Sequence, residues 1–134
     1  MAGEQQQASK QGHVLGWKLD AAEREALLQR FPPEWPNAVA DHVTLDSKAP
    51  QGTPLPTKRV GEIVGGISDG EGLQAMVVRI GGTTDRPDGG TYHITWALDS
   101  GRDRRAVESN DVIAKLGWVP LDDPVPITLI PAWF

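Results

Sequence analysis

Hydrophobic positions near the start of the chain follow two periods, and each predicts a different element. An apolar run over residues 14–19 predicts a buried strand. Asp20 follows as a favourable helix N-cap, and Glu23 three positions later completes a capping-box-like pair. The proline pair at 32–33 is expected to end this helix. Its apolar face, at helical spacing, consists of Ala22, Leu27, Leu28 and Phe31.

The middle of the chain is predicted to contain strands joined by turns. β-Branched residues predict a strand over 39–45, and a proline-rich loop over 46–57 follows it. Residues 59–67 and 73–80 are two further strands, and the Ser-Asp-Gly-Glu-Gly between them predicts a hairpin. The glycine-rich stretch 81–90 is expected to be a mobile turn.

The last third of the chain is again predicted to combine strands with one short helix. We predict a strand over 92–98 and a short helix over 111–116, with Gly117 as its C-terminal glycine. Residues 118–134 are expected to hold one or two strands broken by prolines. The order is therefore β, α, β, then β, β, β, α, β, with one helix in each half. Helices set against antiparallel strands predict an α+β domain of two similar lobes.

Length and composition are typical of one globular domain. A chain of 134 residues is long enough to bury a single core, and 39% hydrophobic with 23% charged residues is ordinary for a globular protein. Fifteen glycines and eleven prolines favour short elements joined by turns over a helical bundle. We expect the polar, glutamine-rich residues 1–12 to be a disordered tail and residues 13–134 to form a single domain.

Several features that the sequence lacks narrow the expected location and partners of the protein. Without cysteine, the chain has no disulfide and no cysteine-ligated metal site. No apolar run is long enough to span a bilayer and no signal peptide is recognisable, so a cytoplasmic protein without a membrane partner is expected. A net charge of −5 argues against binding extended DNA, which needs a basic face. The same charge is compatible with a small anionic ligand in a local pocket.

Two of the three histidines stand in the same four-residue frame. Residues 42–45 read His-Val-Thr-Leu, and residues 93–96 read His-Ile-Thr-Trp. Because side chains alternate between the two faces of a strand, each histidine shares a face with its threonine, and the apolar residues turn to the core. Two such strands lying side by side would form a cleft with two imidazoles and two hydroxyls. The four residues are His42, Thr44, His93 and Thr95.

This combination of side chains suits the cleavage of a phosphodiester. A base must activate the nucleophile and an acid must protonate the leaving oxygen, and two histidines can divide these tasks. Threonine hydroxyls can donate hydrogen bonds to the non-bridging phosphate oxygens, where negative charge grows in the transition state. We expect no metal or other cofactor. A single histidine on a strand is more often structural, and we interpret His13, which lacks the following hydroxyl, in that way.

Two H-x-[ST]-hydrophobic motifs on separate strands, one in each half, resemble the 2H phosphoesterase superfamily of cyclic phosphodiesterases and 2′,5′ RNA ligase-like proteins. The resemblance implies a bilobal fold in which two antiparallel sheets line a central groove, with the helices packed outside. It also implies that His42 and His93 are the acid–base pair and that Thr44 and Thr95 bind the phosphate. The histidines are 51 positions apart (93 − 42), which resembles a compact branch of this superfamily.

The expected function is therefore that of a metal-independent hydrolase. Its substrates would be 2′,3′-cyclic phosphates on RNA ends or nucleotides, or 2′-linked phosphodiesters, and it would act as a monomer in RNA processing or repair. The resemblance implies a 2′-phosphate product, whereas the residues alone leave open the product and which histidine is the acid. Two alternatives remain: a non-catalytic module that binds an RNA end or cyclic nucleotide in the same cleft, and a hydrolase of cyclic oligonucleotide signals.

Residues near the two motifs are candidates for substrate contacts. Lys48 follows the first motif, and Arg102 and Arg105 follow the second, where they form either a phosphate clamp or a solvated charge run. Tyr92 or one of the five tryptophans could stack on a nucleobase, although core packing is the favoured interpretation for each of them. Asp46 is a candidate to orient the first imidazole.

Overall fold

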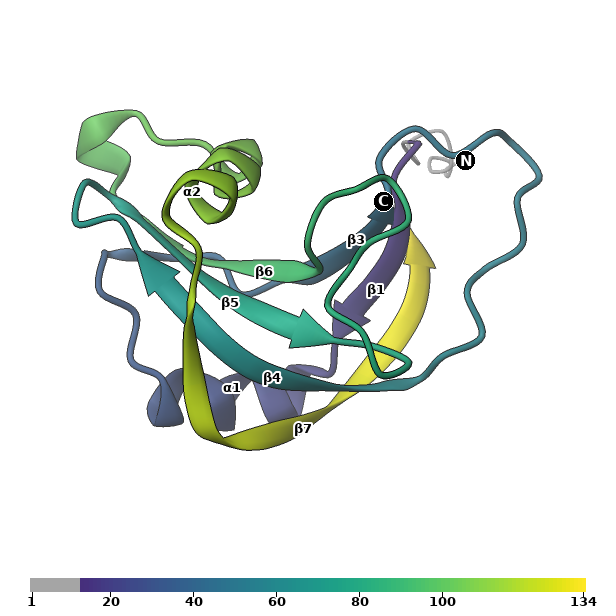
Figure 1. Cartoon of the computed structure of the whole chain (residues 1–134), viewed down its shortest axis with the longest axis horizontal. Helices are drawn as coiled ribbons and strands as arrows, with labels where there is room; N and C mark the ends of the chain where they lie inside the picture. The colour runs from purple at the N-terminus through teal and green to yellow at the C-terminus, as the bar shows by residue number, and fades with distance from the viewer. Residues whose placement is uncertain (1–12) are drawn as a thin grey trace, which may run out of the picture.

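The computed structural model describes residues 13–134, and the expected tail at 1–12 lies outside these described residues. Seven strands pair antiparallel in one curled sheet, in the order β2-β6-β5-β4-β7-β1-β3, and two α-helices pack against it (Figure 1). The fold is therefore α+β, with one sheet where the sequence suggested two. Within 13–134, no helix has the length and apolar character needed to cross a membrane.

The elements follow the predicted order closely. The strand expected over 39–45 is shortened to β3, which begins at His42, and the short strand β2, which was not predicted, precedes it. The elements are β1 (Leu15–Leu19), α1 (Ala21–Arg30), β2 (Asn37–Ala38), β3 (His42–Asp46), β4 (Val60–Ser68), β5 (Leu73–Arg79), β6 (His93–Leu98), the 3-10 helices η1 (Ser100–Arg102) and η2 (Ala106–Glu108), α2 (Ser109–Leu116) and β7 (Val119–Trp133).

Helix α1 begins where its sequence predicts. The Asp20 carboxylate accepts a hydrogen bond from the Glu23 backbone N–H at 3.0 Å, which confirms the N-cap. Glu23 does not complete a capping box, because its own carboxylate accepts hydrogen bonds from the backbone N–H of Thr128, at 2.8 Å, and from the Thr128 hydroxyl. The acidic residue that looked like a local cap therefore ties α1 to β7, 105 positions away.

Strand β7 is continuous despite its prolines and connects the two halves of the sheet. Its first part pairs with β4, as in Val60 with Thr128, and its last part pairs with β1, as in Leu15 with Trp133. The irregularity is confined to a register shift between Ile63 and Gly65 of β4. One half of the sheet thus contains β1 and β3, the other contains β2, β4, β5 and β6, and β7 belongs to both.

The two ends of the sheet order meet because the chain between β2 and β3 hydrogen-bonds to β6. The backbone N–H of Val39 donates to the Trp96 carbonyl at 2.9 Å, and that of Ala40 donates to the Thr95 carbonyl at 3.0 Å. Strands β3 and β6 consequently contact each other although they lie far apart in the sheet order. This closure brings together the two strands that carry the His-x-Thr frames.

Apolar side chains pack on both faces of the sheet. In β5, Met76 and Val78 belong to a cluster inside the curl, whereas Ala75 and Val77 belong to a second cluster beneath α2. Helix α1 packs against the inner cluster through Leu27. Figure 1 shows α1 and α2 on opposite sides of the sheet. The alternation of strand side chains therefore assigns each residue of β6 either to the inner core or to the α2 side.

Candidate active site beneath helix α2

Strand β6 turns His93 and Thr95 towards α2, in agreement with the predicted alternation. Ile94 and Trp96 are fully buried in the inner cluster, and the Trp96 indole N–H donates to the Phe31 carbonyl at 2.8 Å. Thr95, on the opposite face, hydrogen-bonds to Ser109, the first residue of α2. The second His-x-Thr frame therefore lies between the sheet and α2.

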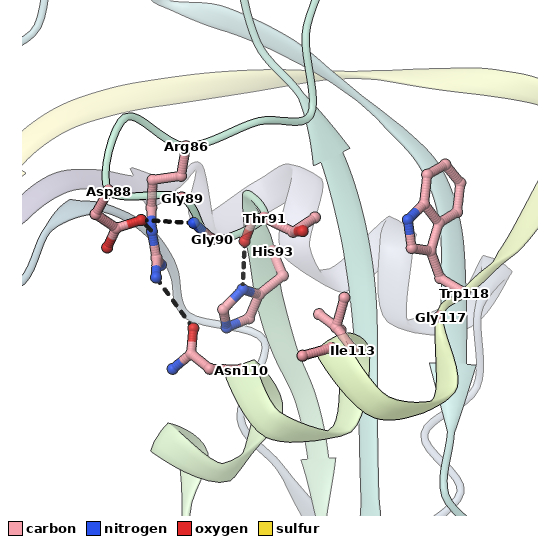
Figure 2. A pocket seen from close by; sticks show the side chains of 11 residues that line it. Arg86, Asp88, Gly89, Gly90, Thr91, His93, Asn110, Ile113, Gly117 and Trp118 are labelled. Carbon is pink, nitrogen blue, oxygen red and sulfur yellow. Dashed lines mark hydrogen bonds and ion pairs between the residues drawn. The ribbon is translucent and has the colours of Figure 1, made fainter.

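A pocket of about 530 Å³ lies between α2 and the loop that precedes β6. Its volume is in the range of small-ligand sites. Figure 2 shows the polar groups gathered at one end of the pocket and the indole of Trp118 at the other, with Ile113 between them. The polar groups at the first end are Arg86, Asp88, His93 and Asn110.

The geometry of His93 assigns its tautomer. Its Nδ1 lies 2.8 Å from the backbone carbonyl of Thr91, which can only accept, so Nδ1 carries the hydrogen and the lone pair of the neutral ring is on Nε2. Burial lowers the pKa of His93 below its ordinary value of 6.5, and the positive charges of Arg86 and His42 lower it further. The Thr91 carbonyl opposes this shift without cancelling it. The neutral ring is therefore a base with its lone pair on Nε2.

The stretch 81–90, expected to be a mobile turn, is held by its own hydrogen bonds and by those of the residues next to it. Ile80 bridges to Thr83, and Asp85 bridges to Thr91. At the tip, the Arg86 N–H donates to the Gly90 carbonyl at 3.0 Å. These contacts place the side chain of Arg86 beside the second histidine strand.

Arg86 is the most buried cation at the pocket, with 10% of its side chain exposed. Its Nε donates to Asp88 Oδ1 at 2.8 Å, and its Nη2 donates to Asn110 Oδ1 at 3.1 Å (Figure 2). The hydrogen bond from Arg86 is the main cause that lowers the pKa of Asp88. Loop and helix thus hold the guanidinium from two sides.

His42, on β3, is held by a different set of neighbours. Its Nδ1 lies 3.0 Å from Asp41 Oδ2, which also accepts from Lys18 Nζ at 2.7 Å. Burial alone would raise the pKa of Asp41, but the hydrogen bonds from Lys18 and His42 lower it below the usual range. The His42 ring also packs against Phe134, with ring centroids 4.5 Å apart. A carboxylate therefore stands at Nδ1 of His42.

The strands that carry the two histidines contact each other, and the charge of His42 is one of the causes that lower the pKa of His93. The two histidines do not have equal access to the same cavity. His93 is among the residues that line the pocket, and His42 is not. The structure therefore brings the two His-x-Thr strands together but opens the pocket on the second histidine.

The two threonines differ in what their hydroxyls contact. Thr95 is buried, and its hydroxyl lies 2.8 Å from the Ser109 hydroxyl and donates to the Ala106 carbonyl at 3.2 Å. These bonds connect β6 to η2 and α2, so this hydroxyl is already engaged. Thr44 is half-buried opposite Gly16 of β1. Neither threonine is among the residues that line the pocket.

Tyr92, a candidate for substrate contact, is not a stacking platform, and the favoured core-packing interpretation applies instead. It is buried in the inner cluster, with its ring edge-on to that of Trp17 at a centroid distance of 5.9 Å. Strand alternation explains the position, because the residue before His93 must face the opposite side of the sheet. Trp118 is the tryptophan that lines the pocket.

The other predicted contacts also lie elsewhere. Lys48 is exposed in the loop after β3, and the Asp46 carboxylate accepts its backbone N–H at 2.9 Å instead of orienting a histidine. Arg102 pairs with Asp99, and the side chain of Arg105 is 76% exposed. None of these four charged side chains lines the pocket. The charge run that follows the second frame is thus directed away from His93.

The residues that sequence reasoning missed are Arg86, Asp88 and Asn110. Arg86 stands in a glycine-rich stretch that looked like a plain turn, and Asn110 lies in the first turn of α2, 24 positions later. Only the packing of the loop against α2 brings them together. A usable signal was present in Asp88-Gly89-Gly90, a tight turn two residues after an arginine and three before a histidine.

Comparison of the chain with protein-family models, with curated proteins and with solved structures finds no match. The functional interpretation therefore depends on the geometry of the pocket and of the two histidines.

Proposed function

We propose that this protein is a metal-independent phosphoesterase of the two-histidine type, with the halves of the curled sheet as the two lobes of a 2H-like fold. The observation that carries the proposal is that two imidazoles, on strands that contact each other, have complementary surroundings. His93 is a buried, neutral ring with its lone pair on Nε2, and His42 has the Asp41 carboxylate at Nδ1. An acid–base pair needs this kind of difference between its members.

The proposed reaction is the hydrolysis of a 2′,3′-cyclic phosphate on an RNA end or a nucleotide. His93 Nε2 takes a proton from water as the water oxygen bonds to phosphorus. The bond from phosphorus to the 3′ oxygen breaks, and protonated His42 donates its Nε2 proton to that oxygen, which leaves a 2′-phosphate. Asp41 pairs with the imidazolium before the transfer. Trp118, at the apolar end of the pocket, would stack on the base.

Incubation with a panel of 2′,3′-cyclic nucleotides and 2′,5′-linked dinucleotides, in excess chelator, tests this proposal. The wild type is expected to open the cyclic phosphates, with the products resolved by the position of the phosphate. His13→Ala is the matched control, because His13 is exposed and stands outside both frames. Turnover should persist in His13→Ala and be lost in His42→Ala and His93→Ala. Unchanged turnover in either of the last two would contradict the proposal.

A binding module that holds a cyclic nucleotide or RNA end without turnover is the second candidate. Two observations favour it: the pocket is lined by His93 without His42, and the Thr95 hydroxyl is already engaged by Ser109. Saturable binding of a cyclic nucleotide with no product after prolonged incubation would decide for this candidate. Product formation would decide for the enzyme.

A further inference from the structure

We infer that Arg86 is the residue of this pocket that binds the ligand's phosphate. The inference rests on the proposed phosphoester ligand and assigns to Arg86 the contact that the sequence pattern assigned to Thr95. It names the group that recognises the phosphate, and it applies whether the protein turns its ligand over or only binds it.

The guanidinium of Arg86 has N–H groups for which no acceptor is found within residues 13–134. Arginine has five N–H groups, and two of them have acceptors here, Nε with Asp88 and Nη2 with Asn110. Within residues 13–134, no protein acceptor is found for the remaining three (5 − 2). Because the side chain is nine-tenths buried and lines the pocket, an oxyanion in the pocket is the acceptor that these groups fit.

The hydrogen-bond partners of Arg86 fix the orientation of its guanidinium plane without neutralising its positive charge. Asp88 occupies the Nε side of the guanidinium, and its own side chain is about half exposed, so solvent screens this pair. Asn110 is neutral and accepts a single hydrogen bond. A phosphate that approaches the Nη atoms therefore meets a cation whose rotamer is already fixed, which lowers the entropic cost of binding.

The loop backbone is shaped to admit this side chain. A Cβ atom on Gly90 would lie 2.6 Å from Arg86 Nη2, so a larger residue at position 90 would displace the guanidinium. Gly89 has a φ of +94°, in the region that favours glycine. Both glycines belong to the turn that runs from Arg86 towards His93.

Arg86 and His93 can both reach a ligand in this pocket. Both line it, and Figure 2 shows them at the same end of the pocket as Asn110. The other candidates lack either exposure to the pocket or freedom to bind. The Thr95 hydroxyl is engaged by Ser109 and Ala106, and Arg105 points to solvent.

Titration with ligands that the proposed reaction does not consume tests the inference. Adenosine 2′-monophosphate and adenosine are titrated into the wild type, Arg86→Gln and the control Arg105→Gln by calorimetry. Loss of charge-assisted hydrogen bonds should weaken binding of the nucleotide to Arg86→Gln by about 10- to 100-fold and leave adenosine binding unchanged. Arg105→Gln should bind as the wild type does. Nucleotide affinity in Arg86→Gln within about twofold of the wild type would overturn the inference, as would a wild type that binds the nucleotide no better than adenosine.

A second measurement on the unmutated protein removes the dependence on variant folding. In ¹⁵N-labelled wild type, inorganic phosphate should shift the Arg86 Nε–H resonance, which is assigned by its loss in Arg86→Lys. A resonance that does not move at saturating phosphate overturns the inference. Arg86-dependent binding without hydrolysis of any cyclic nucleotide contradicts the enzyme and leaves this inference standing. Hydrolysis with binding that is independent of Arg86 contradicts the inference alone.

Discussion

The His93 ring is held at Nδ1 by the Thr91 carbonyl, so a proton exchanged with a ligand passes through Nε2. Four neighbours raise or lower its pKa, but burial is the largest influence. At His42 the neighbour at Nδ1 is a carboxylate instead of a carbonyl. In the proposed reaction, the neutral acceptor behind His93 suits a base and the carboxylate behind His42 suits an acid.

The pKa of His93 gives a prediction at the residue scale. Its folded-state pKa lies below the ordinary 6.5, so the folded protein takes up this proton at a lower pH than the unfolded chain does. The contribution of His93 to stability is therefore present above pH 6.5 and is lost as the pH falls through the folded-state pKa. A titration of the ring protons by NMR should give a midpoint below 6.5. A midpoint at or above 6.5 would show that the ring is not desolvated as described.

Some site residues follow from local rules and others do not. The face shared by His93 and Thr95 follows from strand alternation, and the same rule places Tyr92 in the core. The identity of the group behind each imidazole does not follow, because it depends on which neighbouring side chain turns towards the ring. Asp41 contacts His42, whereas Asp46, which has the favourable parity, accepts from the backbone of Lys48.

At the scale of elements, β6 and α2 are joined by the hydroxyls of Thr95 and Ser109 at 2.8 Å. Ser109 is fully buried, and so is most of Thr95. A buried hydroxyl that loses its partner costs stability, whereas removal of both partners costs less than the sum of the single changes. The structure thus gives this threonine a structural task, in contrast to the phosphate-binding task implied by the superfamily resemblance.

A double-mutant cycle on this pair tests which task applies. Thr95→Val and Ser109→Ala should each lower the free energy of unfolding by about 1–3 kcal/mol, and the double variant should lose less than the two together. Urea denaturation measures the stabilities, and turnover of a cyclic nucleotide is followed in parallel. If Thr95→Val kept full stability and lost turnover, the hydroxyl would be bound to substrate and the structural assignment would be wrong.

The elements that sequence predicted well are those whose signals are local. The Asp20 cap and the two frames are examples, because neighbours within four positions decide them. The length of strand β7 was underestimated, since its prolines suggested interruptions. Pairing with β4 and β1 keeps the strand extended. Glu23 was misjudged for the same reason: its partner Thr128 is distant in sequence.

At the scale of the whole molecule, closure of the sheet decides whether the two histidines can act together. Strand β7 joins the two halves of the sheet. The hydrogen bonds of Val39 and Ala40 to β6 bring β3 alongside β6. No short segment of sequence encodes this closure, which is why the order of elements was predictable and the single curled sheet was not. The net charge of −5 makes a local cation such as Arg86 important for attracting an anionic ligand.

The central claim is that His42 and His93 act on one phosphate. The most direct measurement is kcat/KM for adenosine 2′,3′-cyclic monophosphate in the wild type, His42→Ala, His93→Ala and the double variant, all in excess chelator. Each single change should lower kcat/KM by about 10²- to 10⁴-fold, because each removes one proton transfer. The double variant should be little worse than the poorer single variant, since groups that act as a unit are not additive. Single variants with wild-type rates, or losses that multiply as for independent residues, would contradict the account.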